Sequence, residues 1–314
     1  MNPALAKDKN NNPKGEPDSP LPDQPTVSVV ICTLNREDSL IHVLQLLKEQ
    51  TVQPEEILVI DQSLEHLPST RAYLQENKAR IRYFSLAQPS TTAARNLALK
   101  EVRGEIILFL DDDVLFYPTL IETHLFNYRD PKLGAVTGKV LYDGSEENDW
   151  PWAARITPSG KYLRNFTTNQ KCLVPTLYGC NMSIRRRTAA EAGDFDLNYW
   201  GNFLWEEVDY ALQIRSQGYQ IIYDPQAVVF HVMEKKGGSR NPSPVKYMES
   251  TIFNDWYFFF KYLNKIYWPF LLFRQKRIWL EYLQANRGNL FPLVRQMVRA
   301  YKKTLHYKKN IYKI

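Results

Sequence analysis

The chain has 314 residues, of which 44% are apolar and 13% aromatic, so it can bury a sizeable core in one large domain or two small ones. Its formal charge of +6 is unevenly placed, because the part from Val232 onward carries seventeen Lys and Arg against four Asp and Glu. The most apolar window, 256–273, is interrupted by Lys and Asn, which argues against a membrane-spanning helix.

The first 25 residues are rich in Asn, Pro, Asp and Lys and lack an apolar core, so we predict a disordered leader without a signal peptide. Three cysteines, Cys32, Cys172 and Cys180, show no metal-binding spacing and cannot all pair with one another. This pattern favours a reducing compartment and therefore a cytoplasmic protein.

From residue 26 onward, continuous apolar runs alternate with segments whose apolar residues repeat at helical spacing. Apolar runs without alternation are typical of strands that are buried on both faces. We predict strands at 27–32, 56–60, 81–84 and 105–110, and helices at 37–50, 70–79, 89–102 and 118–128. This rhythm indicates an α/β protein with a Rossmann-like, mostly parallel sheet flanked by helices.

Two of these strands end in acidic residues, the second in Asp61 and the fourth in Asp111, Asp112 and Asp113. In an open α/β sheet, ligands bind just beyond the carboxyl ends of the strands. Three neighbouring carboxylates repel one another unless a cation lies between them, and Mg²⁺ or Mn²⁺ holding a diphosphate would serve. The alternative is an exposed acidic turn after a buried strand.

The second half of the chain is less regular, and residues 143–175 show no readable order. We predict a strand at 134–142, a strand or loop at 176–184, helices at 185–192 and 204–217, and strands at 219–223 and 227–232. Residues 235–244 contain Gly237, Gly238 and Arg240, and are either a mobile lid over an anionic ligand or a surface linker. Beyond them we predict an aromatic helix at 247–273 and basic helices to the end.

No glycine-rich turn follows the first strand, which argues against a dinucleotide cofactor and against a P-loop. A sugar-nucleotide nucleotidyltransferase would carry a glycine-rich activating loop there, whereas residues 33–36 read Thr-Leu-Asn-Arg. A nucleic-acid-binding module would explain the basic end of the chain. It would not explain an acidic cluster at the end of a buried strand.

Several short stretches between residues 26 and 240 are informative together through their order and spacing. They are Val27-Ser28-Val29-Val30-Ile31 with Asn35-Arg36, Ile60-Asp61, Ala93-Ala94-Arg95-Asn96, Asp111-Asp112-Asp113, Gly179 to Arg186, and Trp205-Glu206-Glu207-Val208-Asp209 followed by His231. With these stretches, residues 26–240 resemble a family 2 glycosyltransferase with the GT-A fold.

The resemblance implies a donor site and a metal site at the carboxyl edge of the sheet. Asp61 would accept a hydrogen bond from the base, and Arg240 would help to hold the diphosphate. The implied donor-binding residues are Thr33, Asn35, Asp61, Arg95, Asp111, Asp112 and Arg240. The implied ligands of a divalent metal, Mn²⁺ or Mg²⁺, are Asp111, Asp113 and His231.

The resemblance also implies that Glu207 is the catalytic base, although Asp is commoner at this position. Asn181, Trp205 and Glu206 would lie on the acceptor side. Other interpretations stay open, because acids are favoured in the first turn of a helix by its dipole. In the same way, a lone histidine on an apolar strand is more often a packed core residue than a ligand.

These observations together predict an inverting, metal-dependent glycosyltransferase that moves a sugar from a nucleotide diphosphate donor to a hydroxyl acceptor in surface polysaccharide or glycolipid synthesis. Residues 275–279 miss the Gln-x-x-Arg-Trp pattern of processive polymerases by their spacing, which favours single addition. A nucleotidyltransferase or a non-catalytic sugar-nucleotide-binding protein remains the alternative, and we expect no nucleic-acid partner.

We divide the chain into the leader at 1–25, a GT-A domain at 26–244 and a basic, aromatic, helical extension at 245–314. The aromatic run Trp256 to Phe260 lies beside Lys261 and Lys265 in this extension. It either caps the catalytic core or docks on an anionic membrane, at the cytoplasmic face, as a peripheral contact.

Overall fold

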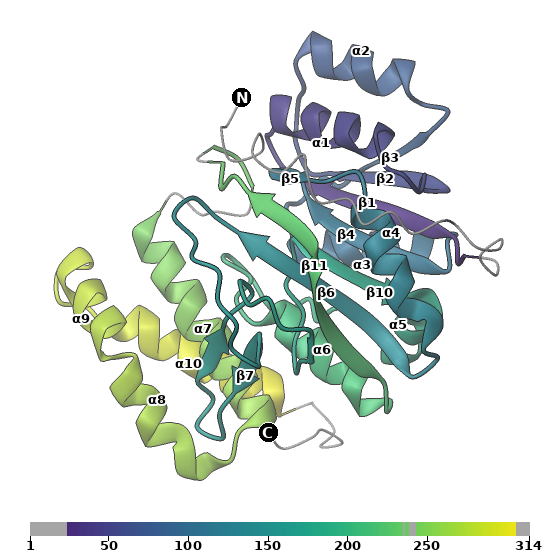
Figure 1. The fold of residues 1–314 in the computed structure, drawn as a ribbon. Helices are drawn as coiled ribbons and strands as arrows, with labels where there is room; N and C mark the ends of the chain where they lie inside the picture. Colours follow the sequence, from purple (N-terminus) through teal and green to yellow (C-terminus); the bar gives the residue numbers. More distant parts are fainter. Residues whose placement is uncertain (1–23, 235, 239–242, 306–314) are drawn as a thin grey trace.

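The computed structural model describes residues 24–234, 236–238 and 243–305, so nearly all of the predicted leader lies outside the described residues. A sheet runs through the middle of the molecule, with helices flanking it and a group of helices from the C-terminal part at one side (Figure 1). The strand order along the sheet is β3-β2-β1-β4-β10-β6-β11-β5, and β9 pairs with β11.

The first half of the sheet is parallel, as the sequence predicts. Its strands are β1 (Val27–Thr33), β2 (Glu56–Asp61), β3 (Ile81–Ser85) and β4 (Ile106–Asp111). β1 lies between β2 and β4, and all these pairs run in parallel register. Because β1, β2 and β4 are covered on both faces, their apolar runs are buried almost throughout. Asp61 and Asp111 therefore end at the same edge.

The second half of the sheet mixes directions, but most strands of the whole sheet run the same way, as predicted. β10 (Asn181–Arg185) runs antiparallel between β4 and β6 (Leu133–Leu141), while β11 (Gln220–His231) runs parallel to β6. The three-residue strand β5 (Val114–Phe116), too short to show a pattern, pairs antiparallel with β11. That pairing brings the residues after Asp113 beside His231.

A further difference from the prediction concerns β11. It is one strand rather than the two predicted, and it continues through an irregularity between Asp224 and Val228. Pro225 lies within this irregularity, where the missing amide hydrogen costs no regular ladder bond. The strand thus reaches from the far edge of the sheet to His231 without interruption.

Helices connect and cover the strands. They are α1 (Asp38–Lys48), α2 (Pro68–Glu76), α3 (Thr91–Glu101), α4 (Leu120–Phe126), α5 (Arg186–Ala192) and α6 (Glu206–Ser216), and a 3₁₀ turn at Asn127–Arg129 follows α4. Leu40, Val43, Leu44 and Leu47 form the buried face of α1, as their spacing predicts. The Ser90 hydroxyl accepts the Ala93 amide at 3.3 Å and caps α3.

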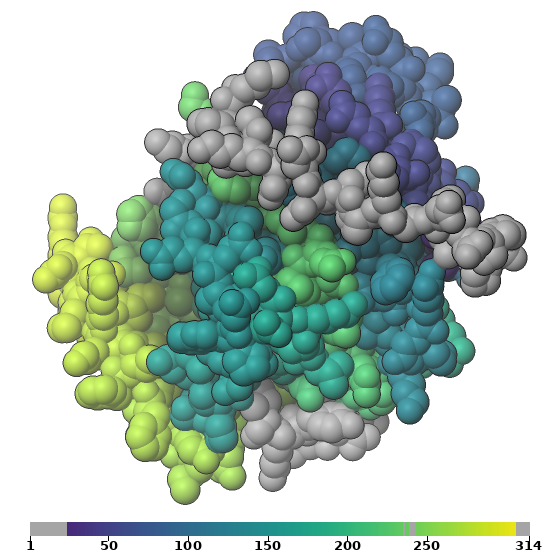
Figure 2. Space-filling model, in the orientation of Figure 1, coloured from purple at the N-terminus to yellow at the C-terminus, as the bar shows by residue number. Residues whose placement is uncertain are grey.

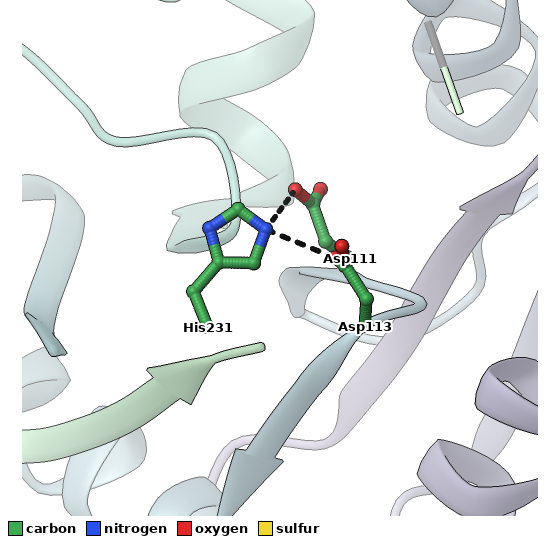
Figure 3. A group of neighbouring side chains, drawn as sticks. All are labelled: Asp111, Asp113 and His231. Atoms are coloured by element: carbon green, nitrogen blue, oxygen red, sulfur yellow. Dashed lines mark hydrogen bonds and ion pairs between the residues drawn. The ribbon is translucent and has the colours of Figure 1, made fainter. Parts of the chain in front are cut away.

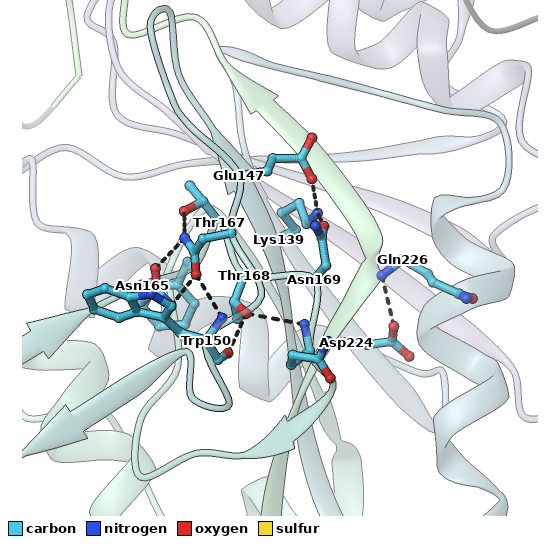
Figure 4. Close-up of polar contacts among 12 residues, drawn as sticks. Lys139, Glu147, Trp150, Asn165, Thr167, Thr168, Asn169, Asp224 and Gln226 are labelled. Carbon is cyan, nitrogen blue, oxygen red and sulfur yellow. Dashed lines mark hydrogen bonds and ion pairs between the residues drawn. The ribbon is translucent and has the colours of Figure 1, made fainter.

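Residues 143–175, which show no readable order in the sequence, are held by polar contacts rather than by a periodic apolar pattern. They contain the short strands β7 (Ala154–Ile156), β8 (Tyr162–Arg164) and β9 (Cys172–Leu173). Asn165 donates to Asn148 at 3.0 Å and to the Trp152 carbonyl at 2.8 Å. Thr168 donates to the Trp150 carbonyl at 2.6 Å (Figure 4). Such contacts join residues far apart in sequence, so local pattern could not reveal them.

The C-terminal helices are α7 (Pro244–Tyr262), α8 (Trp268–Arg274), α9 (Lys276–Ala285) and α10 (Phe291–Thr304), with a 3₁₀ turn at Lys265–Tyr267. They lie together at one side of the molecule, coloured yellow-green in Figure 2. The predicted helix over 247–273 is broken after Tyr262. Among the described residues, no helix combines the length and the apolar character needed to cross a membrane.

A second hydrophobic core forms where α7 packs on α6 and on the loop before it. It includes Trp205 and Val208 together with Trp256, Phe258 and Phe259 of α7. Trp256, Tyr257, Phe258 and Phe259 are all buried, so the idea that this run lies at a membrane interface is wrong. The aromatic run instead covers the core, which is the other interpretation that the sequence left open.

Candidate active site

A cavity of about 1320 Å³ opens at the carboxyl edge of the sheet. It is lined by the ends of β1 and β4, by the loop before α6 and the first turn of α6, and by residues that follow β11. Of the predicted site residues, it brings together Thr33, Asn35, Arg95, Asp111, Asp112, Asp113, Glu206, Glu207 and His231. Parallel strand ends meeting at one edge explain why residues so far apart in sequence share one cavity.

The donor-side wall of the cavity is organised around Arg36, to which the sequence analysis gave no role. Its guanidinium contacts Asp112 Oδ1 at 2.5 Å and Asp113 Oδ2 at 2.9 Å. The Thr33 hydroxyl donates to Asp112 Oδ2 at 2.6 Å. Burial raises the pKa of Asp112 to about 6, although Arg36 and Thr33 act in the opposite direction. Asp112 is therefore engaged with protein donors.

Asp111, Asp113 and His231 converge on one point of the cavity wall (Figure 3). Their ligand atoms all lie within 4.8 Å of one another, with His231 Nε2 2.9 Å from Asp113 Oδ1 and 3.8 Å from Asp111 Oδ2. Two carboxylates and an imidazole form a donor set that suits Mn²⁺ or Mg²⁺. The residues present therefore fit a divalent metal.

The three candidate ligands differ in the exposed fraction of their side chains. The side chain of Asp111 is 40% exposed, that of His231 14%, and that of Asp113 is fully buried. Burial would raise the pKa of Asp113, but the hydrogen bond from His231 and the charge of Arg36 hold this pKa below its usual value. Asp113 is thus kept ionised, and Asp111 offers its carboxylate to the open side.

The opposite wall carries Glu206 and Glu207 on the first turn of α6. Glu206 is buried and forms an ion pair with the equally buried Arg95, whose guanidinium also lies 5.5 Å from the Phe195 ring centroid. Burial raises the pKa of Glu206; Arg95 opposes this shift and Glu207 adds to it. Glu207 is half-buried and lines the cavity. Glu206 is thus engaged with Arg95, and Glu207 is the carboxylate placed at the surface of the cavity.

α7 supports this first turn of α6 from behind. Trp205, which precedes α6 in a left-handed backbone conformation (φ 78°), donates from its indole to Asp255 at 2.6 Å and stacks on Phe258. Asp209, one turn into α6, pairs with the fully buried ammonium of Lys261. Trp205 is itself buried and lies outside the cavity lining, so its position does not support the predicted acceptor contact.

Asp61 lies at the predicted strand end but is fully buried and outside the cavity lining. Its carboxylate accepts the Ser63 amide at 2.7 Å and the Tyr83 hydroxyl at 2.8 Å, and it pairs with His66. The ring of His66 also contacts Glu37 at 3.0 Å. These protein donors occupy the oxygens with which Asp61 was predicted to meet a base.

Asn181 is also placed away from the cavity. It is fully buried, and its side-chain amide donates to the carbonyls of Lys139 and Ala227 at 3.1 and 2.8 Å. Its carbonyl oxygen contacts His124 at 2.9 Å. These contacts join β10 to β6 and β11, so the geometry gives Asn181 a place in the core and no contact with the cavity.

Of the segment 235–244, residues 236–238 and 243–244 are described, and Arg240 lies outside the described residues. Gly238 donates its amide to the Leu34 carbonyl at 2.8 Å, and the Lys236 carbonyl accepts from Arg36 at 3.2 Å. Gly237 has a φ of 74°, and a Cβ there would lie 2.6 Å from the Leu34 carbonyl oxygen. This close approach requires glycine and places the segment against the donor-side wall.

Sequence reasoning missed Arg36 and Lys261 as organising residues. Arg36 is the second residue of the matched Asn35-Arg36 pair, and the need of the acidic triplet for a cation was a signal that could have pointed to it. Lys261 gave no such signal, because its partners Asp196 and Asp209 come together only in the tertiary structure.

Comparisons with known proteins agree with this geometry. A family model described as glycosyl transferase family 2 matches residues 28–193. The uncharacterised glycosyltransferase YwdF of Bacillus subtilis is 35% identical over 230 residues, which are 68% of this chain and 77% of YwdF. The O-antigen chain rhamnosyltransferase RfbN of Salmonella typhimurium is 25% identical over 65% of this chain and 66% of its own length. An uncharacterised glycosyltransferase of Rickettsia felis is 39% identical over 100 residues, where the match spans only 16% of that longer protein.

Two solved structures share the fold. GalNAc-T7 with UDP, GalNAc and Mn²⁺ superposes with a TM-score of 0.62 at 16% identity, over 91% of this chain and 58% of the other. The mannosyltransferase PcManGT of Pyrobaculum calidifontis, with GDP-Man and Mn²⁺, superposes with a TM-score of 0.55 at 18% identity, over 90% and 81%. The fold, the cavity at the strand ends and the family match lead to one conclusion: the chain belongs to glycosyltransferase family 2, a family of enzymes, and has the GT-A fold.

Proposed function

We propose that this protein is an inverting, metal-dependent glycosyltransferase that moves a sugar from a nucleoside diphosphate donor to a hydroxyl acceptor. The observation that carries the proposal is that one cavity holds both a ligand set for a divalent ion and, on the opposite wall, the carboxylate of Glu207. Both solved structures named above contain Mn²⁺ with UDP or a GDP-sugar, which supports the same class of donor and ion.

The donor would lie along the wall formed by Thr33, Asn35 and the acidic triplet, with Arg240 and Arg95 as further predicted contacts. Asp111, Asp113 and His231 would hold the ion, whose chemistry when bound is to stabilise the negative charge that develops on the departing diphosphate. Arg36 contributes from the protein side by keeping Asp113 ionised. Asp61, predicted to contact the base of the nucleotide, is engaged by His66 and Tyr83 in this structure.

Glu207 is the general base in this proposal. It accepts the proton of the acceptor hydroxyl while that oxygen forms a bond to the anomeric carbon of the sugar. The bond between this carbon and the diphosphate oxygen breaks, and its electron pair leaves with the nucleoside diphosphate. A single displacement inverts the anomeric configuration, whereas a retaining route needs a second carboxylate as nucleophile. Glu206 is unsuited to that role because it is buried against Arg95.

The acceptor in this proposal is a growing surface glycan or its lipid-linked precursor, reached from the cytoplasm. The O-antigen chain rhamnosyltransferase among the relatives supports this pathway class. Three cysteines, all free in the structure, support a reducing compartment.

The test is a panel of UDP-, GDP- and dTDP-sugars incubated with the purified full chain, with release of nucleoside diphosphate as the readout. We expect one donor to be hydrolysed slowly with Mn²⁺ or Mg²⁺, and the rate to disappear with a chelator. Asp113→Ala should lower this rate by roughly 10³-fold or more, because it removes a buried ligand. Glu122→Ala, an exposed acid outside the cavity, serves as the matched control.

Other outcomes would point elsewhere. Donor binding without turnover, even with glycan acceptors, would favour a non-catalytic sugar-nucleotide-binding protein. Release of pyrophosphate from a nucleoside triphosphate and a sugar phosphate would instead identify a nucleotidyltransferase. A hydrolysis rate that Asp113→Ala leaves unchanged would remove the acidic triplet from the proposal.

A further inference from the structure

The outer surface of the C-terminal helices exposes an unusual amount of apolar side chain. Ten of the twenty-one large apolar residues that are exposed in the described chain fall between residues 263 and 305. They are Ile266, Phe270, Leu272, Phe273, Leu280, Phe291, Val294, Val298, Tyr301 and Leu305. Phe291, Phe273 and Ile266 are about 70% exposed, at 71%, 69% and 69%. An apolar concentration of this kind marks a binding surface more often than isolated exposed residues do.

α10 is apolar on two faces, which a helix that only packs on its own protein does not need. Leu293 and Ala300 are buried against the second core, where α10 packs along α7. The exposed residues Phe291, Val294, Val298, Tyr301 and Leu305 follow one another at steps of three and four, so they form a stripe along another face of the helix. The side chains of this stripe stay 45–71% exposed, although the ring of Tyr301 contacts that of Phe260.

The same region is strongly basic. Residues 263–305 contain nine Lys and Arg against the single acid Glu281, and all nine cations are exposed. The nine are Lys265, Arg274, Lys276, Arg277, Arg287, Arg295, Arg299, Lys302 and Lys303. Lys276 lies over the ring of Phe273 at 4.8 Å and Lys265 over that of Trp268 at 5.7 Å, so charge and apolar surface adjoin.

We propose that the basic-apolar face, defined as the exposed surface of residues 263–305, docks on a membrane that contains anionic lipids. Aromatic and aliphatic side chains would enter the boundary between headgroups and acyl chains, and the flanking cations would meet the lipid phosphates. The site differs from the aromatic run of α7, which is buried. The inference deepens the proposed function by placing the enzyme where a lipid-linked acceptor would be found, but binding itself can be tested without any transfer reaction.

Charge complementarity favours a lipid surface over a second copy of the chain. A twofold interface through this face would bring two sets of nine cations together with two copies of Glu281, and Glu281 already pairs with Arg277 at 2.7 Å. A nucleic acid would match the cations but would leave the stripe of Phe291, Val294 and Val298 in water. An anionic membrane satisfies both the charge and the apolar surface.

The experiment is flotation of the purified full chain with vesicles of phosphatidylcholine alone or with added phosphatidylglycerol. We expect recovery with the anionic vesicles only, and weaker recovery at about 0.5 M NaCl, where charges are screened. The double variants Phe270→Ser/Phe273→Ser and Phe291→Ser/Val298→Ser should each lower the bound fraction by roughly fivefold or more. Lys276→Ser/Lys302→Ser should lower it too and weaken its salt dependence.

The matched control is Leu64→Ser/Leu173→Ser, which removes two exposed apolar side chains outside this face. It should float as the natural protein does, and all variants should keep the same thermal midpoint. Flotation that is absent, or equal for neutral and anionic vesicles, would overturn the proposal. So would a dimer in solution that the Phe291→Ser/Val298→Ser variant separates, or tight binding of an oligonucleotide with no vesicle binding. Loss of sugar transfer in Asp113→Ala without loss of flotation would keep the two proposals distinct.

Discussion

Two clusters in this molecule place one cation between two carboxylates, and they differ in what lies beside them. Arg36 contacts Asp112 and Asp113 at the wall of the cavity, in contact with the residues proposed to hold the ion. Lys261 contacts Asp196 and Asp209 behind the opposite wall, where Tyr257 also donates to Asp196 at 2.7 Å.

Similar charge arrangements thus lie at the proposed metal site in one place and between α6 and the C-terminal helices in the other. The Arg36 cluster holds carboxylates ready for a ligand. The Lys261 cluster is saturated by its own residues, since Tyr199 and Tyr262 also donate to Asp209 at 2.6 and 2.9 Å. Because Asp209 lies one turn after Glu206, the extension fixes the turn that carries the proposed base. The C-terminal helices thereby support this wall of the cavity from behind without lining it.

We expect the largest effect from a change of Glu207, the proposed base, which lies on the turn of α6 that the Lys261 cluster supports. Glu207→Gln keeps the size of the side chain but cannot accept a proton, so sugar transfer to the acceptor should fall by roughly 10²- to 10⁴-fold. The release of nucleoside diphosphate should be measured together with donor affinity, which should stay unchanged. A variant that loses donor binding to the same extent would assign Glu207 to the donor site. Asp149→Asn, on the surface, is the control.

A paired substitution tests the comparison itself. Lys261→Met leaves two buried carboxylates without their cation and should lower the free energy of unfolding by about 3–5 kcal/mol. Arg36→Met should lower it less, because Asp112 and Asp113 border the cavity and keep Thr33 and His231 as hydrogen-bond partners, but should lower donor hydrolysis by roughly tenfold or more. Urea unfolding and initial rates separate the two effects. Equal stability losses in both variants would contradict the division into an architectural and a chemical cluster.

His66 is a third side chain that lies between two carboxylates, and it carries a positive charge only when it is protonated. It lies between Asp61 and Glu37; burial lowers its pKa, but the hydrogen bonds to these carboxylates raise the pKa above its usual value. Protonated His66 therefore adds stability that is fully present below the unfolded pKa of about 6.5 and is lost as the pH rises through the folded pKa.

We expect the thermal midpoint of His66→Ala to lie below that of the natural protein, by the most at about pH 6 and by less at about pH 8.5. This is the smallest of the expected effects, since it concerns one partly buried pair. A difference that stays constant or grows with pH would show that His66 is neutral in the folded chain. His42→Ala, on the exposed side of α1, controls for the loss of a histidine elsewhere.

Much of the fold could be predicted because the signal is local. Uninterrupted apolar runs marked β1, β2 and β4, and helical spacing marked α1, since both patterns depend only on which faces an element buries. The acids at the strand ends could be placed at one edge for the same reason. β5 and the structure of residues 143–175 could not be predicted from the sequence. Three-residue strands and side-chain networks such as that of Asn148 and Asn165 leave no periodic pattern of apolar residues.

By itself, the sequence determined the α/β class, the cluster of Asp111, Asp112 and Asp113 beyond a buried strand, and the resemblance to the family that the comparisons confirm. The tertiary structure alone decided how charges share partners. In it, Asp61 contacts His66 and Tyr83, Glu206 pairs with Arg95, and the aromatic run of α7 packs in the second core. The physical reason is that a charged or aromatic side chain takes whichever partner the fold brings within a few ångströms, and sequence spacing does not record that distance.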